Sequence, residues 1–391
     1  MLAVTLRLTE QFFLLNKLLG IKKGRILNTA SLLSLRFLAA MIVILFHSRS
    51  NDSAFFKVVP NILLAGPQMA TFFFVLSGFG LVLAYYGKTY FSYKEYWAKR
   101  AARIIPIYLL ALVSVIIVNI IEGSRLDLVA LILHLSFLQS WFPSYPLSLN
   151  YFAWFVSDLF FFYATFPLIL SYIHKSDPNP KRFLLLALSL WLFTQIILTI
   201  LLNTSFYRDL PSSSHDLIYY FPPSHFLSFF LGVAMGYLAI KSKVGYLPNI
   251  RSNLLILISC FLLILFIESE HLITQAIELE LPFGVNFYAP LFMLVIFAFS
   301  TSNGLFANML AAKPLVFLGE ISFSIYIMQL PASFITNSIS TLLYNANIVF
   351  DSYEILLSIH FAILIIIGII LHYTVEKPVK TAVNNRFSQS Q

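Results

Sequence analysis

The sequence predicts an all-α membrane protein with about ten transmembrane helices and both termini in the cytoplasm. The first observation is composition: 59% of the 391 residues are hydrophobic and 11% are charged, against roughly 25% charged residues in soluble domains. The second is that apolar segments near the roughly 20-residue length of a bilayer span recur along the chain. The third is an alternation of connecting segments rich and poor in lysine and arginine. Together they predict an integral, multi-pass protein of the plasma (inner) membrane.

Ten segments are apolar enough to cross a bilayer, of which the eighth is short and the ninth is long. They cover residues 32–49, 69–86, 104–121, 152–173, 183–203, 224–241, 253–268, 286–301, 315–337 and 356–373. The shorter apolar stretch 128–141 is expected to be interfacial or re-entrant. One membrane domain is therefore expected over residues 32–373, between a cytoplasmic amphipathic segment, 1–31, and a short cytoplasmic tail, 374–391.

The basic residues orient these segments. With the N-terminus inside, inner segments hold 20 of the 25 lysines and arginines and outer segments hold 4, the last being Arg36 inside the first helix. This asymmetry places both termini in the cytoplasm. The net charge of +8 then reflects topology, and nucleic acid is not expected as a partner. The single cysteine, Cys260, excludes an internal disulfide and a cysteine-based metal cluster, and no metal is expected.

The first helix carries two ionisable residues, Arg36 and His47, in an otherwise apolar run. Eleven residues bring a helix back to about 20° from its starting direction, so both side chains lie on one face, about 16 Å apart along the axis. Ionisable groups within a bilayer normally face a protein interior or a water-filled cavity. In the predicted orientation Arg36 is near the cytoplasmic end and His47 near the outer end.

Other polar residues are predicted near the outer level. Asp158 lies about two turns into the fourth helix, and His134, His225 and His360 lie at or near the outer ends of apolar segments. An imidazole beside a carboxylate suits general base catalysis, because the carboxylate orients the ring and stabilises the imidazolium. A second interpretation is that helix-end histidines lie among lipid headgroups, and it is favoured for these three. For His47 a functional role is favoured.

The segment 96–108 is expected to be an inner loop, with Pro106 in the first turn of the third helix. Lys99, Arg100 and Arg103 are spaced so that one of the first two can share a face with Arg103. Arginine binds phosphate with two parallel hydrogen bonds, which suggests an anion site. Positive-inside charge alone is the other interpretation.

Small residues interrupt the second helix at Ser77, Gly78 and Gly80. They permit either close helix packing or passage of a thin ligand. In the ninth segment Gln329 and the pair Ser322 and Ser324 are polar at mid-depth. They suit a functional role or hydrogen bonding between helices.

Two acidic residues, Asp158 and Glu320, are predicted to need a partner within the membrane domain. Trp154, Ser157 and Asp158 lie within one turn, and an acid just inside a membrane helix requires a partner. Glu320, near the inner end of the ninth segment, is a possible partner for Arg36.

Short motifs along residues 30–378 carry a family resemblance. They are Arg36 with His47, F-F-V-L-S-G-F at 73–79, R-I-x-P-x-Y at 103–108, L-x-F-L-Q-x-W at 135–141, N…W-x-x-S at 150–157, F-F-L-G at 229–232, L-G-x-I-S-x-S-I-Y at 318–326 and E-x-P at 376–378. In order and spacing this chain resembles the acyltransferase-3 family of integral-membrane acyltransferases, mostly O-acetyltransferases of surface polysaccharides and related acceptors. The chain departs from the family pattern at Asp158, where glutamate is usual, and at Gln329, where histidine is usual.

The resemblance implies that the donor is acyl-CoA, with acetyl-CoA as the expected one, and that it enters from the cytoplasm. It implies that Arg36 and His47 are essential and that the basic segment binds CoA. The predicted donor-binding residues are Lys99, Arg100, Arg103, Ser77, Gly78 and Tyr108. The predicted acceptor-binding residues are Trp154, Ser157, Gln139 and Gln329, and the predicted catalytic residues are His47, Asp158 and Arg36.

The resulting hypothesis is an acyltransferase that moves an acyl group to a hydroxyl of a surface glycan, glycolipid or other acceptor near the outer face. The pantetheine arm is expected to pass between the first and second helices, beside Gly78, and His47 acts as general base, with Asp158 if the two are close. One alternative is a transporter or flippase for a glycan or lipid intermediate. Another is a non-catalytic subunit of a polysaccharide complex.

Overall fold

The computed structural model describes residues 27–50, 53–88, 91–242, 249–346 and 353–388. Within them every regular element is a helix, which confirms the all-α prediction. The predicted amphipathic segment at the N-terminus lies, up to residue 26, outside the described residues. The elements are α2 (Ala30–His47), α3 (Ala54–Val58), η1 (Asn61–Leu64), α4 (Gly66–Tyr85), α5 (Tyr93–Ile121), α6 (Leu128–Leu135), η2 (Gln139–Trp141), α7 (Trp154–Ser176), α8 (Pro180–Leu202), α9 (Ser213–Tyr219), α10 (Pro222–Lys241), α11 (Asn249–Glu268), α12 (Glu270–Ile277), α13 (Ala289–Ser300), α14 (Leu305–Leu310), α15 (Lys313–Glu320), α16 (Ser322–Ile327), α17 (Gln329–Asn345), α18 (Tyr353–Leu371), η3 (His372–Glu376) and α19 (Lys377–Ser388).

Eight helical segments in the described part of the chain are long and apolar enough to cross a membrane. They correspond to eight of the ten predicted spans, and they make the protein a multi-pass membrane protein. The eighth predicted span is α13, which has 12 residues and is too short to cross alone. The ninth is three short helices, α15, α16 and α17, because the chain is interrupted at Ile321 and at Met328.

Side chains stabilise the interruptions in this ninth segment. The Ser322 hydroxyl donates to the Gly319 carbonyl oxygen at 2.8 Å, and the Gln329 amide donates to the Tyr326 carbonyl oxygen at 2.9 Å. Backbone groups freed at a helix break inside a membrane protein need such partners. Both polar side chains therefore bond within their own segment.

Helix α5 corrects the prediction of an inner loop over residues 96–108. It runs through Pro106 for 29 residues, about 43 Å at 1.5 Å per residue, which exceeds the roughly 30 Å hydrocarbon core. Its first turns, with Lys99, Arg100 and Arg103, can thus extend beyond the hydrocarbon without a loop. Pro106 removes one hydrogen bond, to the carbonyl of Ala102, and the flanking turns continue the helix.

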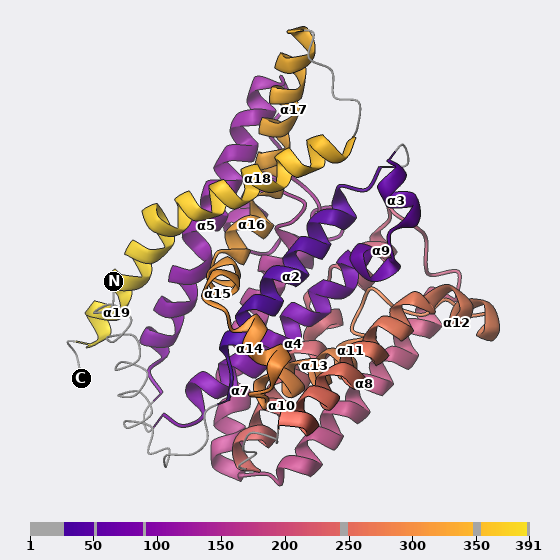
Figure 1. Cartoon of the computed structure of the whole chain (residues 1–391), viewed down its shortest axis with the longest axis vertical. Helices are drawn as coiled ribbons and strands as arrows, with labels where there is room; N and C mark the ends of the chain where they lie inside the picture. The colour runs from indigo at the N-terminus through magenta and orange to yellow at the C-terminus, as the bar shows by residue number, and fades with distance from the viewer. Residues whose placement is uncertain (1–26, 51–52, 89–90, 243–248, 347–352, 389–391) are drawn as a thin grey trace.

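The core of the protein is the pair α4 and α10, which pack side by side (Figure 1). Two glycines permit this close approach. A methyl group at Gly78 would overlap the Phe229 carbonyl oxygen, and one at Gly232 would overlap the Val75 carbonyl oxygen. Gly78, which was predicted to lie beside the donor, is therefore a packing residue between α4 and α10 in this structure.

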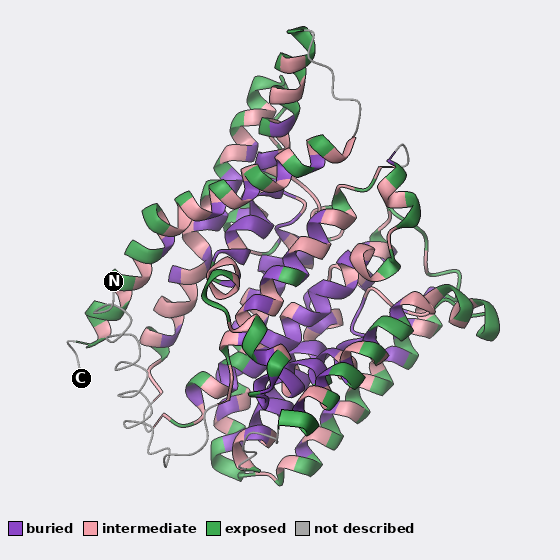
Figure 2. Ribbon diagram, in the orientation of Figure 1, coloured by how far each residue is buried: buried purple, intermediate pink, exposed green. Residues whose placement is uncertain are grey.

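The perimeter is apolar and exposed. Figure 2 shows buried residues at the centre and exposed residues along α8 and α11. Large side chains such as Leu185, Phe193 and Phe261 are more than 60% exposed there, as expected for a surface that meets lipid. The lone Cys260 is half-buried in α11. At the other side of the molecule α19 packs along α5, so residues 377–388 of the predicted tail are helical (Figure 1).

Candidate active site

A cavity of about 340 Å³ opens between α2, α4, α5, α7 and α16. Most of its lining is apolar, from leucine, phenylalanine, isoleucine, alanine and glycine residues. Its polar lining residues are Thr29, Arg36, Ser77, Arg100, Arg103, Tyr163, Ser322 and Tyr326. Four of the residues predicted to act on the donor or in catalysis thus share one cavity, although they come from three separate helices.

The basic end of the cavity is formed by Arg36, Arg100 and Arg103. Arg100 and Arg103 are three residues apart on α5 and so share a face. The Arg100 guanidinium packs over two rings, 5.8 Å from the centroid of Tyr85 and 5.9 Å from that of Tyr163. These rings hold it by cation–π attraction and leave its hydrogen-bond donors available.

Lys99, the fourth predicted basic residue, is directed elsewhere. Its ammonium group forms an ion pair with Glu95 at 2.6 Å, and Lys88 meets the same carboxylate at 3.2 Å. Lys99 is absent from the lining of the cavity. In this structure it belongs to a salt-bridge cluster at the start of α5.

A buried acid, Glu376, lies within electrostatic range of two of these arginines, and the sequence marked it only as part of a motif. It is 3% exposed at the end of the π-helix η3, a type of helix that is frequent at functional sites. One carboxylate oxygen accepts from the Ser324 hydroxyl, and the other accepts from Lys380 at 2.8 Å. The carboxylate also attracts Arg36 and Arg103 electrostatically.

This arrangement corrects the proposed partner of Arg36. Glu320 is exposed at the end of α15, whereas Glu376 is a buried carboxylate within electrostatic range of Arg36. The sequence held one signal for this role. Glu376 stands four residues before Lys380 at the end of an apolar segment, and an acid in such a place requires a partner.

Small residues of α4 line the cavity on another face of the helix from Gly78. Ser77 and Gly80 are lining residues, and a methyl group at Gly80 would meet no atom within 4 Å. Open space on α4 is thus found beside Gly80, two residues beyond Gly78. Tyr108 is absent from the lining, and its hydroxyl donates to the His134 carbonyl oxygen at 2.8 Å.

His47 lies outside the cavity, as the last residue of α2. Its ring is exposed and is surrounded by aromatic side chains, with centroids 5.0 Å away for Phe46, 5.8 Å for Tyr151 and 4.7 Å for Phe152. An exposed imidazole in an apolar surround can accept a proton from a hydroxyl that reaches it from outside.

Asp158 is not brought to His47. It is fully buried on α7, and neither of its carboxylate oxygens accepts a hydrogen bond from any described residue. It lies within electrostatic range of the Tyr326 hydroxyl group. A direct carboxylate–imidazole pair of these two predicted catalytic residues is therefore absent from this arrangement of the described chain.

Most of the predicted acceptor-binding residues donate a side-chain hydrogen bond to a backbone carbonyl oxygen. The Ser157 hydroxyl donates to the Phe137 carbonyl oxygen at 2.7 Å, and the Gln139 amide donates to the Ala153 carbonyl oxygen at 2.7 Å. Gln329 bonds within its own segment, as described above. Trp154 differs, because its half-buried ring lies tilted against the rings of Tyr220 and His225, with centroids 5.3 Å and 5.4 Å away.

The three histidines predicted at outer helix ends, His134, His225 and His360, are buried within the protein. The interpretation that they lie among lipid headgroups is therefore wrong. His225 is 0% exposed, and its Nε2 atom pairs with the Tyr219 carbonyl oxygen at 2.9 Å. His360 Nδ1 pairs with the Thr336 hydroxyl at 3.0 Å. Burial also lowers the pKa of His134, on α6, to about 4, and hydrogen bonding to Ser148 opposes this shift.

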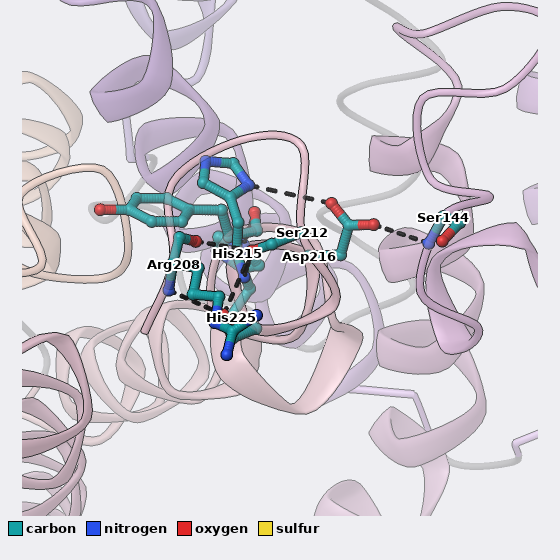
Figure 3. A network of polar contacts seen from close by, with 8 residues as sticks. Ser144, Arg208, Ser212, His215, Asp216 and His225 are labelled. Atoms are coloured by element: carbon teal, nitrogen blue, oxygen red, sulfur yellow. Dashed lines mark hydrogen bonds and ion pairs between the residues drawn. The ribbon is translucent and has the colours of Figure 1, made fainter. Parts of the chain in front are cut away.

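A polar network ties down the connection between α8 and α10. Figure 3 shows His215 beside Asp216, with 3.8 Å between the imidazole Nδ1 and the carboxylate. The other oxygen of Asp216 accepts from the Ser144 backbone N–H at 2.7 Å (Figure 3). This contact joins the α9 region to the segment that leads to Trp154.

Comparison with known proteins shows a protein family whose profile matches nearly the whole chain. The profile of a family described as "Acyltransferase domain" matches residues 30–376. The chain is 27% identical to acyltransferase MdmB of Streptomyces mycarofaciens over 329 residues, which cover 78% of this chain and 79% of MdmB. It is 25% identical to peptidoglycan O-acetyltransferase OatA of Listeria monocytogenes, over 68% of this chain and 45% of OatA. No solved structure matches the chain at comparable significance.

Proposed function

Since this chain belongs to the membrane acyltransferase family whose domain covers residues 30–376, we propose that it moves an acyl group from acyl-CoA to a hydroxyl of a surface glycan or glycolipid. Acetyl is the acyl group that we propose. The family resemblance predicted from the motifs is confirmed. The donor, the acceptor and the role of His47 belong to the proposal. A glycan acceptor is consistent with the name of the similar peptidoglycan O-acetyltransferase.

The observation that carries the proposal is the composition of the cavity. Three arginines within electrostatic range of one another line a space whose other lining side chains are mainly apolar. A CoA thioester has the complementary chemistry, with several phosphates at one end and a long, thin, weakly polar arm at the other. Arginine is the side chain best suited to hold phosphate at fixed geometry, and the apolar part suits the arm.

The proposed reaction takes place between the cavity and His47. His47 accepts the proton of the acceptor hydroxyl, whose oxygen attacks the thioester carbonyl carbon. The carbon–sulfur bond breaks, the acyl group stays on the acceptor oxygen, and the thiolate leaves and is protonated to CoA–SH. Arg36, Arg100 and Arg103 hold the donor, while the negative charge of Glu376 offsets part of the repulsion between Arg36 and Arg103. The donor is proposed to enter from the cytoplasmic side of the plasma membrane, with both termini on that side.

The first test removes two of the three arginines. In purified protein supplied with labelled acetyl-CoA, Arg100→Ala with Arg103→Ala should raise the KM for acetyl-CoA at least about tenfold, because each lost charge-assisted hydrogen bond is worth roughly 1.5–3 kcal/mol. The control is Arg182→Ala, which removes an exposed arginine at the start of α8. It should leave the KM unchanged.

Two outcomes would contradict the proposal. An unchanged KM in the double variant would mean that these arginines only set membrane topology. Binding of a glycolipid by the wild-type protein, with neither binding nor turnover of acetyl-CoA, would instead favour a transporter or flippase.

A further inference from the structure

The cavity ends in a wall of three aromatic rings. The α4 residues that line it run from Phe73 to Ala84, and the Ala84 end adjoins Tyr85, over which Arg100 packs. Phe73 is therefore about 16 Å along α4 from the end at which Arg100 lies, at 1.5 Å per residue. On α7 the lining runs from Phe155 to Tyr163, the other ring under Arg100.

The third member of the wall comes from α16, whose last lining residue is Tyr326. The three rings touch one another. Their centroids are 5.8 Å apart for Phe73 and Phe155, 6.3 Å for Phe73 and Tyr326, and 5.3 Å for Phe155 and Tyr326. The first lining residue of α4, the first of α7 and the last of α16 are thus aromatic, and the three rings form one continuous surface.

One further ring connects this wall with His47. Phe152 lies 5.8 Å from Tyr326 and 4.7 Å from His47, measured between ring centroids. The Tyr326 hydroxyl donates to the Phe152 carbonyl oxygen at 3.2 Å, which fixes the Tyr326 ring in place. The three rings therefore lie at the part of the cavity nearest His47, and Phe152 connects Tyr326 with the exposed imidazole.

We propose that Phe73, Phe155 and Tyr326 determine which acyl group the enzyme accepts, by limiting it to short chains. The proposal rests on the proposed function, that is, on acyl-CoA as the occupant of the cavity. Arginines that hold the phosphates fix how far the arm reaches, so the acyl end arrives at the wall at a constant depth. Packed interiors deform little, and each added methylene must then displace a ring.

Phe73 is the member of the wall that can be changed with least damage. It is half-buried because it faces the cavity, whereas Phe155 and Tyr326 are 6% and 7% exposed. Phe155 is also stacked on Phe74 at 4.8 Å, and Tyr326 holds Phe152. Phe73→Ala should therefore lengthen the cavity and leave the rings of Phe155 and Tyr326 in place.

The experiment compares acyl-CoA binding by full-length wild-type protein and Phe73→Ala in detergent, with acetyl-CoA, butanoyl-CoA and hexanoyl-CoA as probes. The wild type should bind hexanoyl-CoA at least about tenfold more weakly than acetyl-CoA, in keeping with the discrimination that apolar pockets achieve per methylene. In Phe73→Ala this ratio should fall at least about threefold, since the removed ring leaves space for the chain.

The matched control is Phe72→Ala, one residue earlier on α4. Phe72 is 3% exposed and packs on Phe292 at 5.6 Å, outside the lining of the cavity. This variant loses the same side chain and should keep the wild-type ratio. If Phe73→Ala does not fold, Phe73→Leu takes its place, with Phe72→Leu as its control.

The result identifies which idea has failed. If acetyl-CoA binds and the ratio of the two Kd values is the same in wild type and Phe73 variant, the wall does not select the acyl group. If the wild type binds all three probes equally, the inference is overturned in the same way. If the wild type binds neither CoA nor acetyl-CoA, the donor assignment itself fails, and the inference with it.

Discussion

Arg36 and His47 share one face of α2 but have different surroundings. Arg36 lines the cavity together with two other arginines and interacts with the buried Glu376. His47 is exposed at the end of the helix and is in contact with aromatic rings. A single helix face thus joins the arginine-lined cavity to an imidazole outside it, which suits a division into donor binding and acceptor activation.

His47→Ala should separate these two roles. Transfer of the acyl group should fall by about 10²–10⁴-fold, the usual contribution of a general base, while the Kd for acetyl-CoA stays unchanged because His47 lies outside the cavity. Turnover and binding are measured on the same purified sample. His271→Ala, which removes an exposed imidazole on α12, is the control. Near-normal turnover in His47→Ala would exclude His47 as the base.

At the scale of elements, the apolar segments were predictable because a bilayer demands long apolar helices. The interruptions at Ile321 and Met328 were not, since apolarity continues through both and the local hydrogen bonds of Ser322 and Gln329 that accompany them do not show in the apolar pattern. The cavity was foreseen in part. Arg36 and Arg103 were expected near the donor, but the sequence could not tell that Gly78 faces α10 while Gly80 faces the cavity.

The two glycines of α4 give a prediction about helix packing. Gly78→Ala should lower the free energy of unfolding by about 1–3 kcal/mol, because the added methyl group overlaps the Phe229 carbonyl oxygen of α10. Gly80→Ala introduces the same group into open space and should leave the thermal midpoint of the purified protein unchanged or raise it. Equal midpoints for the two variants would show that α4 and α10 pack less closely than described.

At the scale of the whole molecule, the protein has a buried centre and an apolar perimeter. In the most apolar 18-residue stretch of each helix, 67% of the residues are buried in α4 and 17% in α8. This pattern follows from the need of each outer helix to face lipid on one side. Composition predicted it, while the side of the membrane on which each end lies remains a prediction from the distribution of lysine and arginine.

That orientation can be measured with single cysteines, because Cys260 is the only natural one. In a Cys260→Ser background, Glu280→Cys and Lys181→Cys place a thiol at two exposed positions that are predicted to lie on opposite sides. A membrane-impermeant maleimide applied to intact spheroplasts should label the first variant at once and the second only after permeabilisation. The reverse order would invert the proposed topology and put the arginine-lined cavity on the outer side.

The arginine cluster also affects the stability of the protein when the cavity is empty. Three guanidinium groups line one half-buried space, and Glu376, which attracts two of them, is itself bonded to Lys380. Like charges held together at low dielectric raise the free energy of the empty state. An anion that fills the cavity relieves this repulsion, and at 100 times its Kd any such ligand stabilises the folded chain by about 2.7 kcal/mol. An anionic donor bound in this cavity would thus also stabilise the fold, and the empty protein would unfold more readily than the occupied one.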